Sequence, residues 1–363
     1  MRIAIRADAA THIGIGHVMR CLTLANALKS KGAEVSFVCR PFAGHLGDRI
    51  TAEGYELYLL PLSSLTIKPP SPKQTPPHAT WLGENWETDL AQTQIALNGK
   101  QFDWLIIDHY SLDNRWENEM RKFASKIMVI DDLVDRKHDC NLLVDQTFGR
   151  HETEYKLRVP KGCIFLTGSD YALLRPEFNG LRDYSLKRRE KSKMKHLLVC
   201  MGGIDQSNST DLILGALETC LLPPYCRITV VMGENSPWLD SVRKRVAKLT
   251  WPTEIKVNVE NMAQLMADSD LAIGAAGSSS WERCFLGLPT LLFVLAENQR
   301  DIGIALEKKQ AVVLLNKISD IKKAIESLCY SDEKLKSMSQ ASKNITDGFG
   351  VKIILENMEQ LCV

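Results

Sequence analysis

The stretch RIAIRADAATHIGIGHVMRCLTLA, residues 2–25, decides the fold class of this 363-residue chain. Its apolar start, Arg2–Arg6, predicts a buried strand. The residues after the glycines place Val18, Leu22, Ala25 and Leu28 on one face of a helix. A near-continuous apolar strand that leads directly into a helix is typical of a parallel sheet covered by helices on both faces.

This alternation of strands and helices continues along the chain and restarts once. In the first half, further strands are predicted at Glu34–Arg40, Trp104–Asp108, Ile127–Asp131, Leu142–Asp145 and Cys163–Leu166. In the second half they are predicted at His196–Gly203, Arg227–Gly233, Glu254–Val259, Leu271–Gly277, Pro289–Gln299 and Ala311–Asn316. We therefore predict an α/β, GT-B-like protein of two Rossmann-like, doubly wound domains, with a ligand site in the cleft between them.

Two irregular stretches interrupt the alternation of strands and helices. The charged segment RDYSLKRREKSKMK, residues 182–195, is compatible with a linker or with a solvated helix end. We expect domains at residues 1–185 and 195–345, and a C-terminal helix at 346–363 that packs back on the first domain.

The Pro-rich and then aromatic segment Thr66–Trp86 is expected to be a long loop over the active site.

The composition excludes several classes of function. With 45% hydrophobic residues, 25% charged residues and a formal net charge of +1, the chain has no electrostatic reason to bind nucleic acid or an anionic membrane. It contains no signal-peptide pattern and no apolar run of the roughly 18 residues that a spanning helix needs. The ten cysteines are scattered without a CxxC pair, which favours reduced core thiols. A cytoplasmic location is therefore expected.

The first glycine cluster, GIGHVM, is a weak signal by itself. It lacks the third glycine of GxGxxG, and no GxxxxGK[ST] occurs in the chain. Three interpretations stay open: a loop that binds phosphate, a loop that holds a catalytic histidine, and a tight strand-to-helix connection.

The second cluster, GAAGSSSWERCFLGLP, contains more residues of the types that bind a nucleotide. Small residues follow a predicted strand, and Ser280 or a neighbour can cap a helix whose unpaired N–H groups favour a phosphate. Glu282, in the first turn of that helix, can accept hydrogen bonds from ribose hydroxyls. The alternative is a helix terminus with an acidic residue in its first turn and no ligand.

These motifs carry a family resemblance. GAAGSSSWERCFLGLP resembles the donor-nucleotide motif of two-domain glycosyltransferases of the GT-B fold, in particular that of the lipid-II-forming N-acetylglucosaminyltransferase. A longer set is similar, in the same order, to the UDP-2,4-diacetamido-2,4,6-trideoxy-β-L-altropyranose hydrolases of pseudaminic acid biosynthesis. The set is RADAATHIGIGHVMRCLTLA, LIIDHY, VIDDL, CNLLVDQ, GSDYALLRPEF, VCMGGID, GAAGSSSWE, ENQ and DGFG. These matches run from Arg2 to about Gly350, nearly the whole chain.

The resemblance implies a reaction and its catalytic residues. Water would displace UDP from the anomeric carbon with inversion, without a metal or other cofactor, on a route to flagellin or surface-polysaccharide sugars. The histidine of GIGH, His17, would be the main catalytic residue, and Tyr110 of DHY and Asn298 of ENQ would line the sugar site. A histidine titrates near neutrality and can take the proton of the attacking water. The small Gly14 and Gly16 would let His17 face the cleft.

Substrate contacts are expected from the same motifs. The residues are Asp8, Gly14, Gly16, Arg20, Tyr171, Gly202, Gly203, Gly277, Ser278, Ser279, Glu282 and Gln299. Asp8 would orient His17, bind the sugar or cap the loop, and Arg20 would reach a phosphate or form a structural ion pair. Asp131 and Asp132 have no further ligand at metal spacing nearby, so we expect them to cap strand ends rather than to bind a metal.

Two other function classes fit the same scaffold. A GT-B glycosyltransferase would need an acceptor groove and an apolar patch that faces the membrane. A UDP-sugar-binding module without catalysis would not need His17, Tyr110 and Asn298. The chain has no apolar-basic surface segment and contains all three residues. We therefore expect a UDP-sugar as the partner, no nucleic acid, no stable membrane insertion, and a monomer.

Overall fold

The computed structural model describes residues 1–62, 76–191 and 193–362, which form two compact units. Unit 1 comprises Met1–Leu173 and Phe349–Val363, and unit 2 comprises Leu174–Gly348. The expected boundary at residue 185 falls inside a helix that belongs wholly to unit 2. The C-terminal helix is part of unit 1, where it contacts the first helix of the chain.

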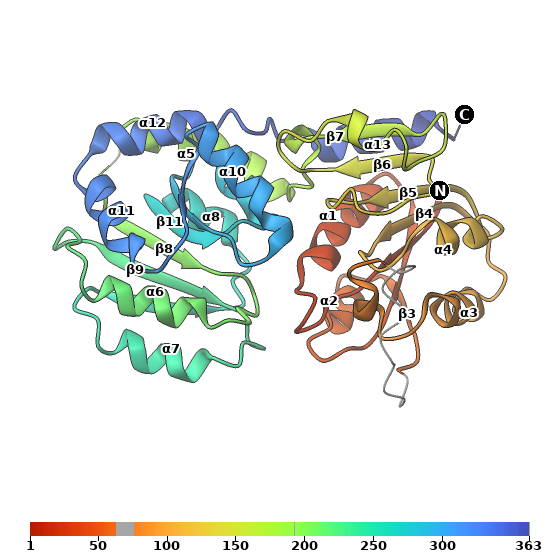
Figure 1. The fold of residues 1–363 in the computed structure, drawn as a ribbon, viewed down its shortest axis with the longest axis horizontal. Helices are drawn as coiled ribbons and strands as arrows, with labels where there is room; N and C mark the ends of the chain where they lie inside the picture. Colours follow the sequence, from red (N-terminus) through yellow and green to blue (C-terminus); the bar gives the residue numbers. More distant parts are fainter. Residues whose placement is uncertain (63–75, 192, 363) are drawn as a thin grey trace. The chain divides into compact units, whose positions relative to one another are not determined.

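Unit 1 contains a seven-stranded sheet in which neighbouring strands are parallel, in the order β3-β2-β1-β4-β5-β6-β7 (Figure 1). Its strands are β1 (Arg2–Ala7), β2 (Glu34–Cys39), β3 (Glu56–Leu59), β4 (Phe102–Asp108), β5 (Ala124–Ile130), β6 (Leu142–Asp145) and β7 (Ile164–Thr167). In register, Ile3 of β1 lies between Val35 of β2 and Trp104 of β4. The strand order reverses beside β1, and ligands of such sheets bind at the carboxyl ends of the strands near that reversal.

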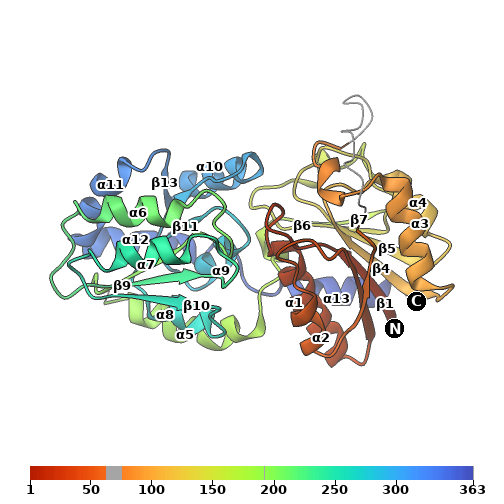
Figure 2. The same cartoon turned by 90° about the horizontal axis from the view of Figure 1, so that it is seen from below.

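Helices cover both faces of this sheet because β1 is apolar on both sides. Ile3 and Ile5 pack with α1 (Gly16–Ser30), α2 (Gly47–Ala52) and α13 (Gly350–Gln360). Ala4 packs with α3 (Trp86–Leu97) and α4 (Asn114–Met120) on the opposite face, and Figure 2 shows the two groups of helices on either side. Three short 3₁₀ turns complete the unit: η1 (Ala79–Leu82), η2 (Glu152–Glu154) and η3 (Ser169–Tyr171).

Unit 2 contains a six-stranded parallel sheet in the order β10-β9-β8-β11-β12-β13. Its strands are β8 (His196–Cys200), β9 (Arg227–Met232), β10 (Thr253–Val257), β11 (Leu271–Ala275), β12 (Thr290–Phe293) and β13 (Val312–Leu315). Its helices are α5 (Pro176–Arg189), α6 (Ser209–Leu217), α7 (Leu239–Val246), α8 (Met262–Asp268), α9 (Ser279–Phe285), α10 (Arg300–Lys308), α11 (Asp320–Cys329) and α12 (Asp332–Ser342), with the turn η4 (Glu297–Gln299). Two doubly wound sheets of this kind confirm the α/β class predicted from the sequence.

The structure refines three of the local expectations. Residues 182–189 are the end of α5, a helix of unit 2 in which Arg188 pairs with Asp270, so for these residues the helix end expected from the sequence holds and the linker does not. The strand β3 was not predicted, because it is a four-residue edge strand without a buried face. Within Thr66–Trp86, residues 66–75 lie outside the described residues; the described part, 76–86, is loop and turn with the single 3₁₀ turn η1 (Ala79–Leu82) in it, and α3 begins at Trp86.

The predicted strands of unit 2 are also longer than the observed ones. The apolar run 271–277 continues two residues past β11, and the run 289–299 continues six residues past β12. The Ala276 N–H still donates to the Phe293 carbonyl of β12 at 2.9 Å, and the residues after it leave the sheet at its carboxyl edge. Across the described parts of the chain, no helix has both the length and the apolar character needed to span a bilayer.

Candidate active site

An aspartate stands at the carboxyl end of four neighbouring strands of unit 1, β1, β4, β5 and β6. Asp8 follows β1, Asp108 ends β4, Asp131 follows β5 and Asp145 ends β6, and all four are fully buried. Because the carboxyl ends of parallel strands meet at one edge of the sheet, these carboxylates gather along that edge. Buried carboxylates need cationic or hydrogen-bonding partners, and those partners decide what each one can do.

His17 lies in the first turn of α1, and Asp108 holds it. Its Nδ1 atom is 2.6 Å from Asp108 Oδ1, and its side chain is 10% exposed. Burial alone would raise the pKa of the Asp108 carboxyl, but Arg20 and His17 hold that pKa well below its usual range. An ionised carboxylate only accepts hydrogen bonds, so the imidazole proton lies on Nδ1 and the Nε2 lone pair is left for a substrate proton.

Arg20 joins this pair to a second carboxylate. Its Nε and Nη2 atoms donate to both oxygens of Asp108 at 2.6 and 2.7 Å, and its Nη1 donates to Asp132 at 2.6 Å. The Tyr110 hydroxyl donates to the same Asp132 at 2.9 Å. Each nitrogen of the Arg20 guanidinium donates to a carboxylate, and Nη2 also lies 3.5 Å from His17 Nδ1, so the structure favours an ion-pairing role for Arg20 over a phosphate contact.

The ring of Tyr110 completes the cluster around His17. The two ring centroids are 4.5 Å apart and the rings are nearly perpendicular. Burial and the Asp132 carboxylate raise the pKa of Tyr110 well above its usual value, so the phenol keeps its proton. Of the three predicted catalytic residues, the structure therefore brings His17 and Tyr110 into contact within unit 1.

Asp8 is not the residue that orients His17. Its Oδ1 accepts hydrogen bonds from Arg6 and from the backbone N–H of Arg40, both at 2.7 Å, and its Oδ2 lies 3.1 Å from His109 Nε2. These contacts fix the start of the loop after β1. The sequence reasoning missed Asp108 as the partner of His17, although Asp108 stands in the DHY motif at the end of an apolar run.

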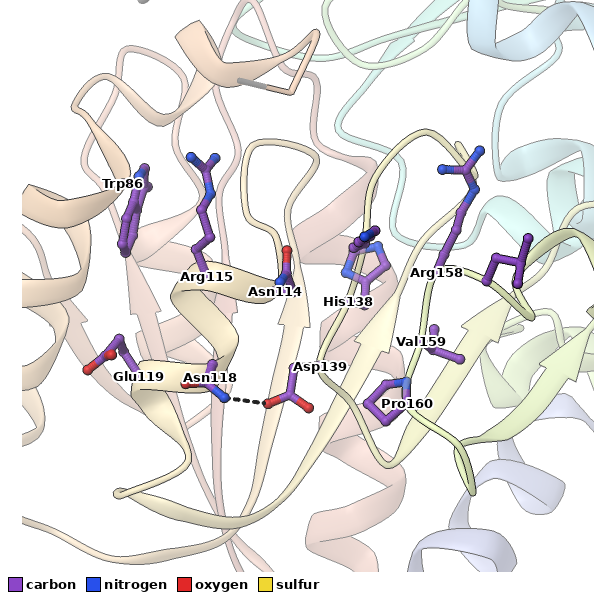
Figure 3. Close-up of a pocket in the computed structure, with 12 residues that line it drawn as sticks. Trp86, Asn114, Arg115, Asn118, Glu119, His138, Asp139, Arg158, Val159 and Pro160 are labelled. Carbon is purple, nitrogen blue, oxygen red and sulfur yellow. Dashed lines mark hydrogen bonds between the residues drawn. The ribbon is translucent and has the colours of Figure 1, made fainter. Parts of the chain in front are cut away.

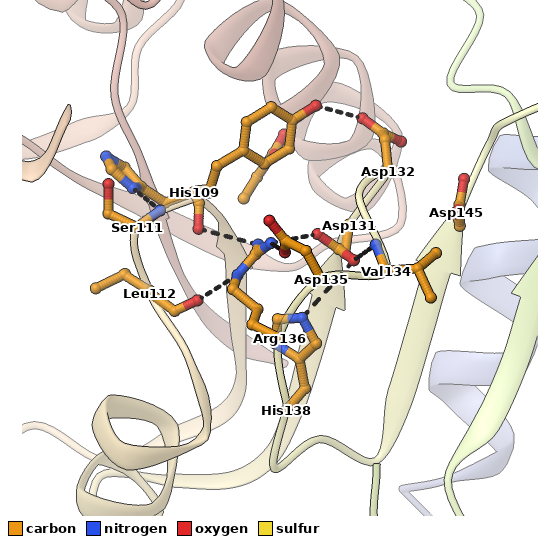
Figure 4. A network of polar contacts seen from close by, with 12 residues as sticks. His109, Ser111, Leu112, Asp131, Asp132, Val134, Asp135, Arg136, His138 and Asp145 are labelled. Atoms are coloured by element: carbon orange, nitrogen blue, oxygen red, sulfur yellow. Dashed lines mark hydrogen bonds and ion pairs between the residues drawn. The ribbon is translucent and has the colours of Figure 1, made fainter. Parts of the chain in front are cut away.

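Asp131 belongs to the buried polar network of Figure 4, in which Arg136 also donates to the His109 carbonyl. Its carboxylate pairs with Arg136 at 2.8 Å and accepts from the Val134 N–H at 3.0 Å. His138 lies on its other side, with Nδ1 2.7 Å from Glu117. Asp131 thus fixes the loop after β5, as the sequence predicts for a residue that caps a strand end. Within residues 1–62, 76–191 and 193–362, no three His, Cys, Asp or Glu side chains are grouped as a metal site.

One proton in this network is shared between carboxylates. The Tyr155 hydroxyl oxygen is 2.9 Å from Asp131 Oδ2 and 2.8 Å from Asp145 Oδ2. Since a phenol has one proton, it can donate to only one of them, and the second contact needs a protonated carboxyl. Burial and the nearby Asp132 carboxylate raise the pKa of Asp145 to about 7, against the lowering effect of Arg150, whose Nε lies 2.6 Å from the same Asp145 Oδ2.

Two buried groups should each contribute stability that is lost as the pH rises, Asp145 through about 7 and His138 through about 9. The folded pKa of Asp145, about 7, lies above the value of roughly 3.9 expected in the unfolded chain. Against the lowering effect of burial, Glu117 and Asp131 raise the pKa of His138 to about 9. Groups with raised folded pKa values stabilise the fold below their unfolded pKa and lose that effect as pH rises through the folded pKa.

Thermal unfolding of wild type and Asp145→Asn between pH 5 and pH 9 tests this expectation. The variant keeps a neutral side chain at position 145, so its Tm should fall less between pH 5 and pH 8. Asp48→Asn, on the exposed first turn of α2, serves as the control and should follow the wild type. Equal pH slopes for Asp145→Asn and wild type would show that Asp145 is ionised in the folded protein.

The serine-rich loop of unit 2 follows β11 and leads into α9. No serine side chain caps this helix: Ser278 is the N-cap residue but makes no capping bond, and Ser280 donates to the Ala275 carbonyl. This corrects the expected serine cap. Arg283, which is buried, donates to Ser279 Oγ at 2.9 Å and to the Ala275 carbonyl at 2.7 Å, and so places a positive charge directly beneath the loop.

Glu282 has a partner in the structure. Its Oε1 accepts from the Nε and Nη2 atoms of Arg175 at 3.3 and 3.2 Å. Burial raises the pKa of Glu282, and Arg175 opposes that shift. The carboxylate is therefore held in one orientation at the start of α9 by a residue of the GSDYALLRPEF motif.

The remaining predicted residues of unit 2 lie in loops after β8 and β12. Gly202 has a left-handed φ of 99°, and the Gly203 carbonyl accepts from the Gly233 N–H. Asn298 and Gln299 are half-buried in η4, and a Cβ on Gly277 would lie 3.9 Å from Gln299 Nε2. The ENQ motif and the serine-rich loop are therefore neighbours.

In unit 1, the remaining residues predicted to bind substrate have mainly structural roles. Gly14 has a left-handed φ of 88° and closes a tight turn with Ala10, and Gly16 is the first residue of α1. Tyr171 ends η3 and packs against the core beside α13. The glycines of GIGH thus shape the turn that presents His17.

A cavity of about 560 Å³ also opens in unit 1, beside α4 (Figure 3). Among the residues that line it are Trp86, Arg115, His138 and Arg158. Figure 3 shows Trp86 and Arg115 side by side, and the Arg115 guanidinium lies 5.2 Å from the Trp86 ring centroid. None of the residues predicted to bind substrate is among those that line this cavity.

Comparisons with known proteins agree with this architecture. The family described as glycosyltransferase family 28 C-terminal domain matches residues 216–351. The UDP-2,4-diacetamido-2,4,6-trideoxy-beta-L-altropyranose hydrolase of Campylobacter jejuni is 28% identical over 310 residues, which are 85% of this chain and 97% of that protein. This confirms the resemblance to that hydrolase stated from the motifs.

Two solved structures share the fold over nearly the whole chain. MurG of Acinetobacter baumannii has a TM-score of 0.68 at 13% identity, with 99% of both chains covered. UDP-GlcNAc 2-epimerase from Neisseria meningitidis, solved with UDP-GlcNAc, has a TM-score of 0.60 at 12% identity and covers 99% of this chain and 100% of its own. These similarities confirm the GT-B-like fold class.

Proposed function

We propose that this protein hydrolyses UDP-2,4-diacetamido-2,4,6-trideoxy-β-L-altropyranose to UDP and the free sugar, with inversion and without a metal ion. The observation that carries the proposal is the buried His17–Asp108 pair, at 2.6 Å, at the carboxyl edge of the sheet of unit 1. The similarity to the Campylobacter jejuni hydrolase, at 28% identity, supports the choice of substrate and reaction.

In the proposed mechanism, His17 acts as the general base. Its Nε2 takes a proton from a water molecule while the water oxygen forms a bond to the anomeric carbon. The bond from that carbon to the UDP oxygen breaks, and UDP leaves with the bonding electrons. Asp108 keeps the proton on Nδ1 and stabilises the imidazolium that forms. Tyr110 packs against the base and restricts its ring.

Residues of unit 2 would bind the leaving group. Arg283 beneath the serine-rich loop contributes positive charge, and Ser279, which accepts a hydrogen bond from it, has a hydroxyl proton to offer to a phosphate oxygen. Glu282 would accept hydrogen bonds from the ribose. Asn298 and Gln299, close to this loop, would contact the sugar or the diphosphate. UDP is a good leaving group, so orientation and charge stabilisation are the main tasks of the protein.

A transferase is the second candidate, because the match to the glycosyltransferase family 28 C-terminal domain favours it. One assay separates the two functions. The protein is incubated with the UDP-sugar, with and without excess EDTA and without any acceptor, and followed by NMR. The proposed hydrolase releases UDP and the opposite anomer of the free sugar in both samples. Absence of UDP release in these acceptor-free samples would favour a transferase, and loss of turnover in EDTA that a divalent ion restores would overturn the metal-free mechanism.

Glu282→Ala should weaken UDP binding by about 1.5–3 kcal/mol, the range for hydrogen bonds to a charged group. The loss of a ribose contact lowers affinity for UDP without a large change in folding. Calorimetric titration with UDP measures it. Glu333→Ala is the matched control, because Glu333 also lies in the first turn of a helix of unit 2, α12, and is exposed. Unchanged UDP affinity in Glu282→Ala would leave Glu282 only as the ion-pair partner of Arg175.

A further inference from the structure

A short segment after residue 75 crosses the carboxyl edge of unit 1 and is fixed there by three loops. The Ser111 hydroxyl, after β4, donates to the His78 carbonyl at 2.5 Å. The His12 side chain, after β1, hydrogen-bonds to the backbone of Trp81. A Cβ on Gly83 would approach the Phe42 ring, after β2, to 2.6 Å, so the segment packs closely there. The turn η1 therefore has a defined place at the edge that carries His17.

This segment brings two aromatic rings to the candidate catalytic residues. The His78 and Trp81 ring centroids are 4.4 Å apart. They lie 5.5 and 5.8 Å from the Tyr110 ring, which is itself 4.5 Å from His17. The four rings form one continuous cluster, which extends from the proposed base to the turn η1.

The outer half of this cluster is open to solvent and carries no charge. His17 and Tyr110 are buried, whereas His78 and Trp81 are half-buried. Burial lowers the pKa of His78, so its imidazole is neutral at neutral pH. An uncharged aromatic surface beside a catalytic base binds apolar groups and does not compete for the diphosphate of the substrate.

We propose that His78 and Trp81 form the wall of the sugar subsite and select sugars whose hydroxyls are replaced by methyl and acetamido groups. This inference rests on the proposed function and names the specificity-determining residues of the same site. A methyl group at C6 and the methyl groups of two acetamido substituents present apolar surface to the rings. A sugar with hydroxyl groups in those places would lose hydration against the same rings without compensation.

Trp81→Ala and Trp81→Phe test the proposal, with Trp86→Ala as the matched control. Trp86 is also half-buried, but it lines the cavity beside α4. For the diacetamido-trideoxy UDP-sugar, we expect Trp81→Ala to raise KM about tenfold, the effect of losing roughly one aromatic contact, with a smaller change in kcat. Trp81→Phe should recover most of the loss, and Trp86→Ala should have the KM of the wild type.

Binding measurements separate this inference from the reaction itself. Calorimetry should show that Trp81→Ala binds UDP within about twofold of the wild type but loses most of its preference for the diacetamido-trideoxy UDP-sugar over UDP-GlcNAc. If Trp81→Ala keeps both the KM and that preference, the sugar-wall proposal is wrong even though hydrolysis stands. A third outcome is that the wild type prefers this UDP-sugar but does not hydrolyse it, and that Trp81→Ala has no such preference. In that case the sugar-wall proposal stands and the proposed reaction is wrong.

Discussion

His17→Asn should lower kcat for UDP-sugar hydrolysis by about 10²–10⁴, the typical contribution of a positioned general base. The amide of asparagine can form a hydrogen bond with Asp108 but cannot accept and hold the proton of the attacking water. UDP affinity should change by less than about tenfold, because the residues proposed to bind the nucleotide belong to unit 2. The pH profile of kcat should lose one ionisation that the wild type shows.

Stopped or continuous assays of UDP release, with calorimetric UDP titration, check both parts of this prediction. His151→Asn is a suitable control, since His151 is exposed at the start of η2 and should behave as the wild type. A His17→Asn protein with near-normal kcat but poor UDP binding would show that the loop GIGHVM is a phosphate site. It would reverse the roles proposed for the two units.

Asp108→Asn should also reduce kcat by a factor of about 10²–10⁴, by loss of control over the imidazole. An amide has a donor as well as an acceptor, so it can stabilise the imidazole with the proton on Nε2, where that nitrogen can no longer act as a base. The substitution also leaves Arg20 with one carboxylate, Asp132, in place of two. Breaking a buried ion pair costs about 3–5 kcal/mol, so a lower Tm is expected as well.

Asp89→Asn separates the loss of stability from the loss of catalysis. Asp89 is fully buried and pairs with Arg6 and Arg40 at 2.8 and 2.7 Å, so its replacement also disrupts two buried ion pairs. It has no contact with His17 among the hydrogen bonds of the described residues. Both variants should lose Tm, and only Asp108→Asn should lose most of its kcat. Equal losses of kcat in the two variants would contradict a positioning role for Asp108.

The periodicity of the sequence was enough to predict the fold class. Val18, Leu22, Ala25 and Leu28 are all buried on the sheet side of α1, as their spacing predicts. Central parallel strands are apolar on both faces, so their runs are conspicuous, whereas the edge strand β3 has no such pattern. Where apolar runs continue past the sheet edge, as after β11, periodicity cannot locate the end of the strand.

The candidate catalytic residues could be predicted only in part from the sequence. The GIGH and DHY motifs indicated His17 and Tyr110, and an aspartate after nearly every apolar run was visible in RADA, LIIDHY, VIDDL and LLVD. No local pattern shows which aspartate orients the histidine. Asp8 is nine residues from His17 in the sequence, and Asp108 is 91 residues away.

The sequence by itself determined the class of the central strands, the single restart of the βα pattern and the residue types available for chemistry, because these depend on local spacing. Only the tertiary structure decided which charges are paired. Parallel strands far apart in the chain end side by side, and there Asp108 pairs with His17 and Arg20, Asp8 with Arg6 and His109, and Glu282 with Arg175. A buried charge must find its partner within a few ångströms, and that partner is set by the packing of the sheet rather than by proximity along the chain.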